Sequence, residues 1–387
     1  MSAEPGRLLV VDDTEVNRDL LARRLRRLGH SVETAKSGGE ALEKLSAAEF
    51  DLVLLDIMMP GLDGYEVLRR LRDDPQRRHV PVIMISAVDE IESVVRCIEL
   101  GATDYLPKPF NPVILRARVS ATLEKKRLHD QQRFWARSLE RELEIGREIQ
   151  ASFLPEALPE LAGWEIAASF APARQVGGDF YDAFPLPGGR LGLVLADVCD
   201  KGVGAALFMA LFRTLIRSNA EREESASDAE HSRSTIGRTN EYIVRTHGRA
   251  NMFATVFFGV LELTTGRLSY VNAGHEPPIL LGGSGEPERL APTGPAVGLM
   301  PDSSFGSGET QLGSNQILLG ITDGVTEARS PAGELFGEPR LLVLAAEPVS
   351  SASALLDRIA SEVRQHTGGA EPTDDVTLLA VRRTRPG

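Results

Sequence analysis

The feature that most limits how this chain can fold is a long interval without proline. No proline occurs between Pro112 and Pro155, and Gly146 is the only glycine in that interval. Proline and glycine are the residues that most often end a helix, whereas proline suits the first helical position. The interval therefore predicts one helix that begins at Pro112 and, at 1.5 Å per residue, reaches about 60 Å. It divides the 387 residues into two regions, and about 150 residues per domain leaves room for two or three domains.

Before this helix, short apolar runs alternate with amphipathic stretches. Strand-like runs lie at 8–11, 32–35, 52–56, 80–85 and around Tyr105, and helical patterns lie between them. This alternation is typical of βαβ units that build a parallel sheet. We expect five strands and five helices in one α/β doubly wound domain that spans residues 1–121.

Residues 122–150 are predicted to form a helical linker. Apolar residues recur at helical spacing at Leu115, Val119 and Leu123, and again at Trp135, Leu139 and Leu143, but the pattern is interrupted near residues 125–132. Two interpretations stay open. The linker pairs with a second copy as a coiled-coil homodimer, or it is a solvated helix that packs on its own chain.

The region after Pro155 has a different pattern, dominated by β-type runs. These runs lie at 191–197, 254–263, 267–271, 279–281, 316–322 and 376–381. Helical patterns occupy 205–218 and 352–366, and the polar stretch 221–234 is predicted to be a surface loop. The mixture predicts a second domain, residues 151–387, of α+β class with antiparallel sheets.

Composition excludes several classes of protein. With 43 Lys and Arg against 55 Asp and Glu, the net charge of −12 disfavours nucleic-acid binding, which depends on concentrated basic residues. The two cysteines, Cys97 and Cys199, cannot build a disulfide framework or a cysteine-rich zinc site. No apolar run approaches the roughly 20 residues of a membrane span, and the N-terminus has no signal core, so we expect a cytoplasmic protein without membrane association.

Acidic residues follow the predicted strands of the first domain. Asp12 and Asp13 follow the first strand and Asp56 ends the third, so the three carboxylates meet at the carboxyl edge of the sheet. A cation must neutralise such a cluster, and oxygen ligands favour Mg²⁺. Ser86 and Lys108 follow later strands at the same edge, and the set can accept a phosphoryl group on a carboxylate.

Residues 1–121 resemble the receiver domain of two-component response regulators. The motifs that support the resemblance are Val10–Asp13, Leu54–Gly64, Ser86–Ala87 and Tyr105–Phe110. The resemblance implies that Asp56 is the phosphoacceptor and that Asp12, Asp13 and Asp56 hold Mg²⁺ with the Met58 carbonyl. It also implies that Ser86 and Lys108 bind the phosphoryl oxygens, that Tyr105 is the aromatic switch, and that the Lys108–Pro109 peptide is cis. A sensor histidine kinase is the implied partner.

Aspartates also cluster beside the apolar runs of the second domain. They lie in the segments 176–182, 196–202, 322–325 and 373–377. Buried carboxylates are costly without a metal or a partner, and His275 has no cysteine pair that would complete a zinc site. An all-oxygen site for two Mg²⁺ or Mn²⁺ ions, able to activate a water and hold a phosphoryl group, is the better interpretation.

The second domain resembles the bacterial serine/threonine phosphatases of the PPM (PP2C-like) superfamily, in the SpoIIE and RsbU branch. The supporting motifs are Ile149–Pro155, Gly177–Asp182, Asp197–Gly202, Met252–Thr255, Asn272–His275, Thr322–Ala328 and Asp374–Thr377. The resemblance implies a β-sandwich flanked by helices, and metal ligation by Asp179, Asp197, Asp323 and Asp374 with the Val198 carbonyl. Asp374 and Asp375 remain alternatives for the last ligand, as do Mn²⁺ and Mg²⁺. No arginine matches the phosphate-binding arginine of the eukaryotic branch.

Together the two resemblances imply a response regulator in which phosphorylation of Asp56 controls a metal-dependent protein serine/threonine phosphatase. The implied substrate is a phosphoserine or phosphothreonine on an anti-sigma-factor antagonist. The alternative is a catalytically inactive PP2C-fold scaffold that signals by phosphorylation-dependent protein binding. A DNA-binding output is disfavoured because no compact helix-turn-helix pattern follows Pro155, and a cyclic-dinucleotide synthase because Gly177–Phe180 lacks a required acidic residue.

Overall fold

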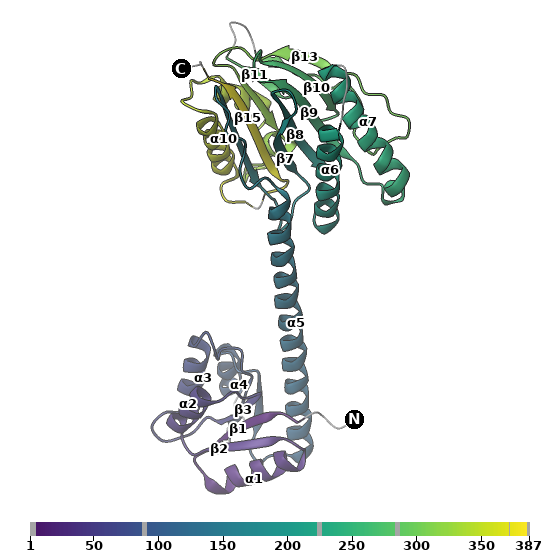
Figure 1. Ribbon diagram of the computed structural model, residues 1–387. Helices are drawn as coiled ribbons and strands as arrows, with labels where there is room; N and C mark the ends of the chain where they lie inside the picture. Colours follow the sequence, from purple (N-terminus) through teal and green to yellow (C-terminus); the bar gives the residue numbers. More distant parts are fainter. Residues whose placement is uncertain (1–4, 87–90, 223–226, 283–286, 371, 385–387) are drawn as a thin grey trace. The chain divides into compact units, whose positions relative to one another are not determined.

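The computed structural model describes residues 5–86, 91–222, 227–282, 287–370 and 372–384. The chain divides into two compact units, residues 1–139 and 140–387 (Figure 1). In the described residues, no helix is long and apolar enough to cross a membrane.

The first unit contains a parallel sheet of five strands in the order β2-β1-β3-β4-β5. The strands are β1 (Arg7–Val11), β2 (Ser31–Ala35), β3 (Leu52–Asp56), β4 (Val82–Ser86) and β5 (Asp104–Pro107). The helices are α1 (Glu15–Arg27), α2 (Gly38–Ala47), α3 (Gly64–Asp73), α4 (Ile91–Glu99) and α5 (Pro112–Phe153). The predicted doubly wound fold is confirmed. Its strand order reverses beside β1, so the carboxyl ends of β1 and β3 border one crevice.

Both faces of this sheet are buried, which explains why its strands are continuous apolar runs. Along β1, Leu9 and Val11 belong to the core under α2 and α3, whereas Leu8 and Val10 belong to the core under α1 and α5. Successive side chains of a strand point to opposite faces, so a strand covered on both sides needs an apolar residue at every position.

The long helix α5 begins at Pro112, as predicted, and spans 42 residues. Asn111 precedes it, and its side-chain oxygen accepts a hydrogen bond from the Val113 N–H at 2.9 Å, which satisfies one free donor of the first turn. Leu115, Val119 and Leu123 are buried against the sheet of the first unit. The prediction that a single helix joins the two domains is therefore confirmed.

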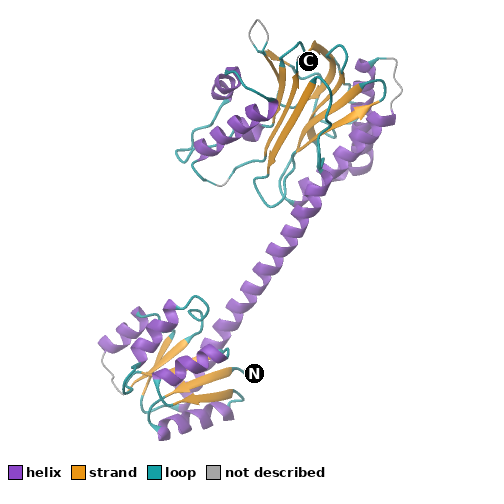
Figure 2. Ribbon diagram, turned by 60° about the vertical axis from the view of Figure 1, so that its left-hand side comes forward, coloured by secondary structure: helices purple, strands orange, loops and turns teal. Residues whose placement is uncertain are grey.

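The second unit contains two antiparallel five-stranded sheets (Figure 2). One sheet has the order β13-β10-β9-β8-β7 and the other β12-β11-β14-β15-β6. The strands are β6 (Trp164–Ala171), β7 (Phe180–Leu186), β8 (Arg190–Val198), β9 (Ala254–Glu262), β10 (Arg267–Ala273), β11 (Ile279–Leu281), β12 (Glu288–Arg289), β13 (Gly308–Gln311), β14 (Ile317–Ile321) and β15 (Val376–Arg383). The helices are α6 (Val203–Arg222), α7 (Asp228–His247), the short 3₁₀ helix Gly248–Ala250, α8 (Asp323–Thr326), α9 (Glu338–Ala346) and α10 (Ala352–Thr367).

Helices cover the outer face of each sheet in this unit (Figure 1). Along β8, Leu193 and Leu195 pack in the core shared by the two sheets, whereas Val194 and Ala196 pack under α6 and α7. The other sheet packs its second face against α9 and α10. Gly320 allows the two sheets to pack closely, because a Cβ there would come within 2.8 Å of Leu195 Cδ2. The predicted β-sandwich flanked by helices is confirmed.

The prediction that residues 221–234 form a surface loop is largely wrong. Helix α6 continues to Arg222, and α7 begins at Asp228, with the Ser227 hydroxyl accepting a hydrogen bond from the Glu230 N–H; residues 223–226 lie outside the described residues. The part of α7 that falls within this prediction, residues 228–234, buries the polar side chains of His231 and Ser232 and contains no large aliphatic residue. The apolar periodicity that identifies a helix in a sequence is therefore absent here.

Candidate functional site

In the first unit, three predicted aspartates converge at the carboxyl edge of the sheet. Asp12 and Asp13 follow β1, and Asp56 is the last residue of β3. Oxygen atoms of all three carboxylates lie within 4.8 Å of one another, with Asp12 and Asp56 buried and Asp13 exposed. Gly64 at the start of α3 allows the chain to pass over this edge, because a Cβ there would lie 2.2 Å from the Asp56 carbonyl oxygen.

Lys108 supplies the positive charge of this pocket. Its Nζ lies 2.9 Å from Asp12 Oδ2 and 3.0 Å from Asp56 Oδ2. Burial raises the pKa of Asp56, and the charge of Asp12 adds to this effect against the hydrogen bond from Lys108. The Lys108–Pro109 peptide is cis, as expected, and the Lys108 N–H donates to the Ser86 carbonyl. One ammonium against three carboxylates leaves excess negative charge, and the oxygen donors fit Mg²⁺.

The other predicted receiver residues lie on neighbouring strands. Ser86 ends β4 and Tyr105 lies on β5, where it pairs with Met84, and the Ser86 and Tyr105 side chains are both buried. The side chain of Met58 is 68% exposed, so only its backbone carbonyl is suited to the role assigned to it.

In the second unit, Asp179 lies directly before β7 and is fully enclosed. Its Oδ2 accepts hydrogen bonds from the hydroxyl groups of Thr322, at 2.7 Å, and Thr377, at 2.6 Å. The resemblance implies no role for these threonines, although Thr322 directly precedes Asp323 and only Val376 separates Thr377 from Asp375. They fix the orientation of a carboxylate that has no cationic partner among the described residues.

Four aspartates of this unit interact through their charges. Burial and the charge of Asp197 raise the pKa of Asp179 well above its ordinary value. Burial and the charge of Asp323 raise the pKa of Asp197 to about 7, and burial and the charge of Asp374 raise the pKa of Asp323. Each of these carboxylates thus lies within electrostatic range of another, and we refer to Asp179, Asp197, Asp323 and Asp374 as the acidic site, although no three of them approach one another as closely as Asp12, Asp13 and Asp56 do.

Asp374 and Asp375 have different surroundings, which bears on the alternative left open by the sequence. Asp375 is buried, and its carboxylate accepts hydrogen bonds from the N–H groups of Ala173, Gly178 and Asp179 at 2.8, 2.6 and 3.3 Å. Asp374 is partly exposed, and its Oδ2 lies 2.7 Å from the Nζ of Lys201. Both carboxylate oxygens of Asp375 therefore accept hydrogen bonds from backbone N–H groups, whereas Asp374 binds the ammonium group of Lys201.

Three glycines allow the backbone to approach this site. A Cβ on Gly177 would lie 2.3 Å from Asp375 Oδ2, one on Gly178 would lie 2.7 Å from the Val198 carbonyl oxygen, and one on Gly324 would lie 1.9 Å from the Asp375 carbonyl oxygen. The Gly-Gly-Asp and Asp-Gly motifs are thus needed for close packing of three loops, and they place the Val198 carbonyl beside the Asp179 loop.

The residues of this acidic site fit divalent cations. All donors are oxygen atoms, three of the carboxylates have raised pKa values from burial and mutual repulsion, and in the described part of the unit only Lys201 forms an ion pair with one of the four. Carboxylates in such surroundings stay ionised when a bound cation compensates them.

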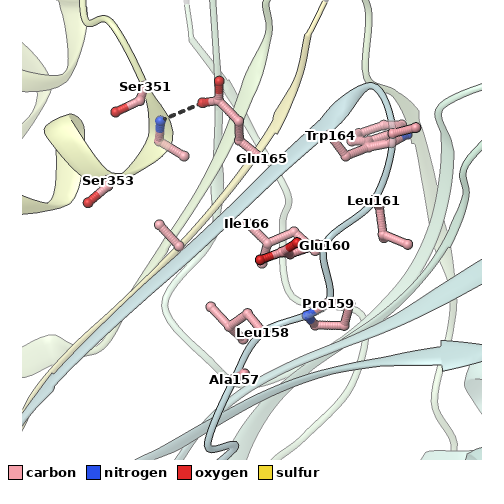
Figure 3. Close-up of a pocket in the computed structure, with 13 residues that line it drawn as sticks. Ala157, Leu158, Pro159, Glu160, Leu161, Trp164, Glu165, Ile166, Ser351 and Ser353 are labelled. Atoms are coloured by element: carbon pink, nitrogen blue, oxygen red, sulfur yellow. Dashed lines mark hydrogen bonds between the residues drawn. The ribbon is translucent and has the colours of Figure 1, made fainter.

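A pocket elsewhere in the same unit has different chemistry. It has a volume of about 660 Å³ and is lined by residues 157–162, 164–167 and 351–353 (Figure 3). The side chain of Glu165 accepts a hydrogen bond there from the Ala352 N–H at 2.9 Å. None of the predicted metal ligands lines this pocket, so it is separate from the acidic site.

Known proteins similar to this chain match its two parts. Protein IcfG of Synechocystis sp. is 45% identical over 262 residues, which are 62% of this chain and 41% of that protein. Response regulator PleD of Caulobacter vibrioides is 43% identical over 128 residues, which are 33% of this chain and 28% of that protein. The chain thus spans less than half the length of these relatives. The solved SiaA-PP2C domain of Pseudomonas aeruginosa has the same fold, with a TM-score of 0.54 at 21% identity over 64% of this chain and 98% of that one.

Two family models locate the domains. The model for the response regulator receiver domain matches residues 8–120, and the model for stage II sporulation protein E (SpoIIE) matches residues 187–384, which is more than half of the chain. The chain therefore belongs to the SpoIIE family, and it joins a response regulator receiver domain to a SpoIIE-type PP2C phosphatase domain.

Proposed function

We propose that this protein is a metal-dependent protein serine/threonine phosphatase whose activity is controlled by phosphorylation of Asp56. The observation that carries the proposal is the acidic site of Asp179, Asp197, Asp323 and Asp374, in which one buried and three partly buried carboxylates repel one another and only Asp374 has a cationic partner among the described residues. The receiver pocket on the same chain supplies the control element. We take the receiver to be residues 1–121, the linker 122–150 and the phosphatase domain 151–387.

The four carboxylates, with the Val198 carbonyl, would hold two Mn²⁺ or Mg²⁺ ions. When bound, such ions supply an activated water and neutralise the phosphoryl oxygens. The protein's own contribution is to hold the ligands in position. Thr322 and Thr377 orient Asp179 through their hydroxyl groups, and Asp375 holds the loop that carries Asp179.

Hydrolysis of p-nitrophenyl phosphate and of a phosphoserine peptide tests the activity. We expect Mn²⁺-dependent turnover that falls by about 100-fold or more in Asp197→Asn and Asp323→Asn, because removing a ligand weakens both water activation and charge neutralisation. Asp357→Asn, at an exposed aspartate of α10, is the matched control and should keep wild-type turnover. Absence of turnover in the wild type with Mn²⁺ present would favour the inactive scaffold instead.

Control by the receiver rests on the charge balance of its pocket. A phosphoryl group on Asp56 adds about two negative charges beside Asp12 and Asp13, which Lys108 and Mg²⁺ would neutralise. Ser86 and Tyr105 lie on adjacent strands, so movement of Ser86 toward the new oxygens frees space for the ring. Chain continuity through α5 offers a route from this edge to the phosphatase domain.

The control is measured by comparing phosphatase rates with and without beryllium fluoride, in the wild type and in Asp56→Asn. Coupling between sites is typically worth about 5- to 150-fold, and we expect the mimic to raise the rate in the wild type only. Equal rates in all four samples would show that the domains are joined without being coupled.

The partners follow from the two domain families. We propose a sensor histidine kinase as the phosphodonor for Asp56, and a phosphoserine or phosphothreonine of an anti-sigma-factor antagonist as the substrate. Comparison of kcat/KM on a phosphorylated antagonist with that on an unrelated phosphoprotein tests the second assignment. A ratio near one would exclude a dedicated antagonist phosphatase.

We also propose that α5 pairs with a second copy. Leu128, Trp135 and Ile149 share one heptad position, which Glu142 also occupies, and each of these three apolar residues is more than half exposed. This spacing is typical of a coiled-coil seam and leaves the residues uncovered by their own chain. Sedimentation should give a dimer for the wild type and a monomer for Trp135→Glu. Arg137→Glu, about 200° away around the helix, should stay dimeric.

A further inference from the structure

The last turn of α5 makes a contact that none of the site assignments uses. Gln150 is only 5% exposed, although the neighbouring Ile149 is 54% exposed. Its Nε2 donates a hydrogen bond to the Gly177 carbonyl at 2.5 Å, and its Oε1 accepts one from the Gly177 N–H at 3.0 Å. One side-chain amide thus satisfies both polar groups of a buried residue.

Gly177 belongs to the loop that leads to Asp179. On its other side this loop is held by Asp375, which accepts hydrogen bonds from the N–H groups of Gly178 and Asp179. Helix α5 also lies against this loop at Gly146. A Cβ atom added there would be in ordinary van der Waals contact with Val176, at 3.8 Å from its Cγ1. The backbone of the loop that leads to Asp179 is therefore held by two side chains, that of Asp375 just before β15 and that of Gln150 near the end of α5.

We propose that Gln150 is a positioning residue that ties the place of Asp179 to the end of α5. The paired hydrogen bonds fix both the distance and the direction between the helix and the loop. Any axial shift or rotation of α5 would move the Nε2 and Oε1 atoms of Gln150 away from the Gly177 backbone. An apolar side chain of equal size would leave the buried N–H and C=O of Gly177 without partners. The inference rests on the proposed role of Asp179 as a metal ligand, and it identifies the contact through which α5 acts on the site.

Mn²⁺ binding by the full chain tests the inference, measured by titration calorimetry with the receiver site removed by Asp13→Asn. Changes in groups that orient metal ligands typically weaken binding by about 10- to 100-fold, and we expect this loss in Gln150→Leu. Gln132→Leu, at an exposed glutamine of the same helix, should bind like its parent. Gln150→Glu keeps the acceptor for the Gly177 N–H but loses the donor to the Gly177 carbonyl, so its Mn²⁺ affinity should also be weakened. This variant decides the question if Gln150→Leu does not fold.

A second readout separates positioning from a general loss of structure. In Gln150→Leu, excess Mn²⁺ should restore the maximal rate on p-nitrophenyl phosphate, so that the metal concentration at half-maximal rate rises whereas the maximal rate is kept. Wild-type Mn²⁺ affinity in both Gln150 variants, with binding lost in Asp179→Asn, would overturn this inference alone. Unchanged Mn²⁺ binding in Asp179→Asn would instead overturn the proposed metal site.

Discussion

Replacement of Asp375 by asparagine should destabilise the metal-free protein. The carboxylate of Asp375 accepts hydrogen bonds from three backbone N–H groups, one through Oδ1 from Ala173 and two through Oδ2 from Gly178 and Asp179. Asparagine keeps one acceptor oxygen, and its NH₂ group then faces an N–H group. Hydrogen bonds to a charged acceptor contribute about 1.5–3 kcal/mol each, so loss of one or two should lower the free energy of unfolding by about 2–4 kcal/mol.

Asp374→Asn is the matched comparison, because the two positions are adjacent and the chemical change is the same. Asp374 pairs with Lys201, and the two side chains are 31% and 36% exposed. Exposed pairs contribute about 0–1 kcal/mol, so the metal-free stability should change little. Mn²⁺ binding should be lost in Asp374→Asn if this residue is the ligand.

Urea unfolding in EDTA, followed by tryptophan fluorescence, measures the difference. Trp164 is buried in the phosphatase unit, whereas Trp135 is already exposed, so the signal reports mainly on the unit of interest. With a urea dependence of about 2–3 kcal/mol/M, the expected loss moves the midpoint of Asp375→Asn by about 1 M. A wild-type midpoint for Asp375→Asn, together with a lowered midpoint for Asp374→Asn, would refute the assignment of structural and ligand roles.

Three further changes test other parts of the second unit. Lys201→Met should lower the Mn²⁺ concentration at half-saturation by up to about fivefold, because the ammonium no longer competes with the metal for Asp374. Weaker Mn²⁺ binding in calorimetry would exclude this competition. Burial lowers the pKa of His275 to about 4, so the unfolded chain binds a proton between pH 6.5 and 4 that the folded chain excludes. Stability should fall by roughly 3 kcal/mol across that interval, and His275→Asn should flatten this part of the pH profile. Gly324→Ala should lower the melting temperature, because its Cβ would lie 1.9 Å from a carbonyl oxygen, whereas Gly204→Ala, with open space around its Cβ, should not.

The architecture could be predicted wherever local pattern and burial coincide. The strands of the receiver are buried on both faces, so each is a continuous apolar run, and its acidic residues lie where those runs end. In the second unit, β8 and β9 were predicted within a residue or two because apolar residues lie on both of their faces. Helix α7 was missed because it buries polar side chains, and the edge strand β6 was missed because most of its residues are only partly buried.

The sequence by itself determined which residues could form the two acidic sites, since Asp12, Asp56, Asp179 and Asp323 each lie beside an apolar run in a motif with few other uses. Only the tertiary structure decided how the surroundings of neighbouring residues differ. Asp374 and Asp375 are equivalent by local propensity, and they differ because the Gly178 N–H, 197 positions away in the chain, lies 2.6 Å from Asp375. The same holds for Gln150, whose two partner atoms belong to a residue 27 positions further along. Secondary structure depends on neighbours in sequence, whereas the surroundings of a buried polar group depend on which distant backbone atoms are brought beside it.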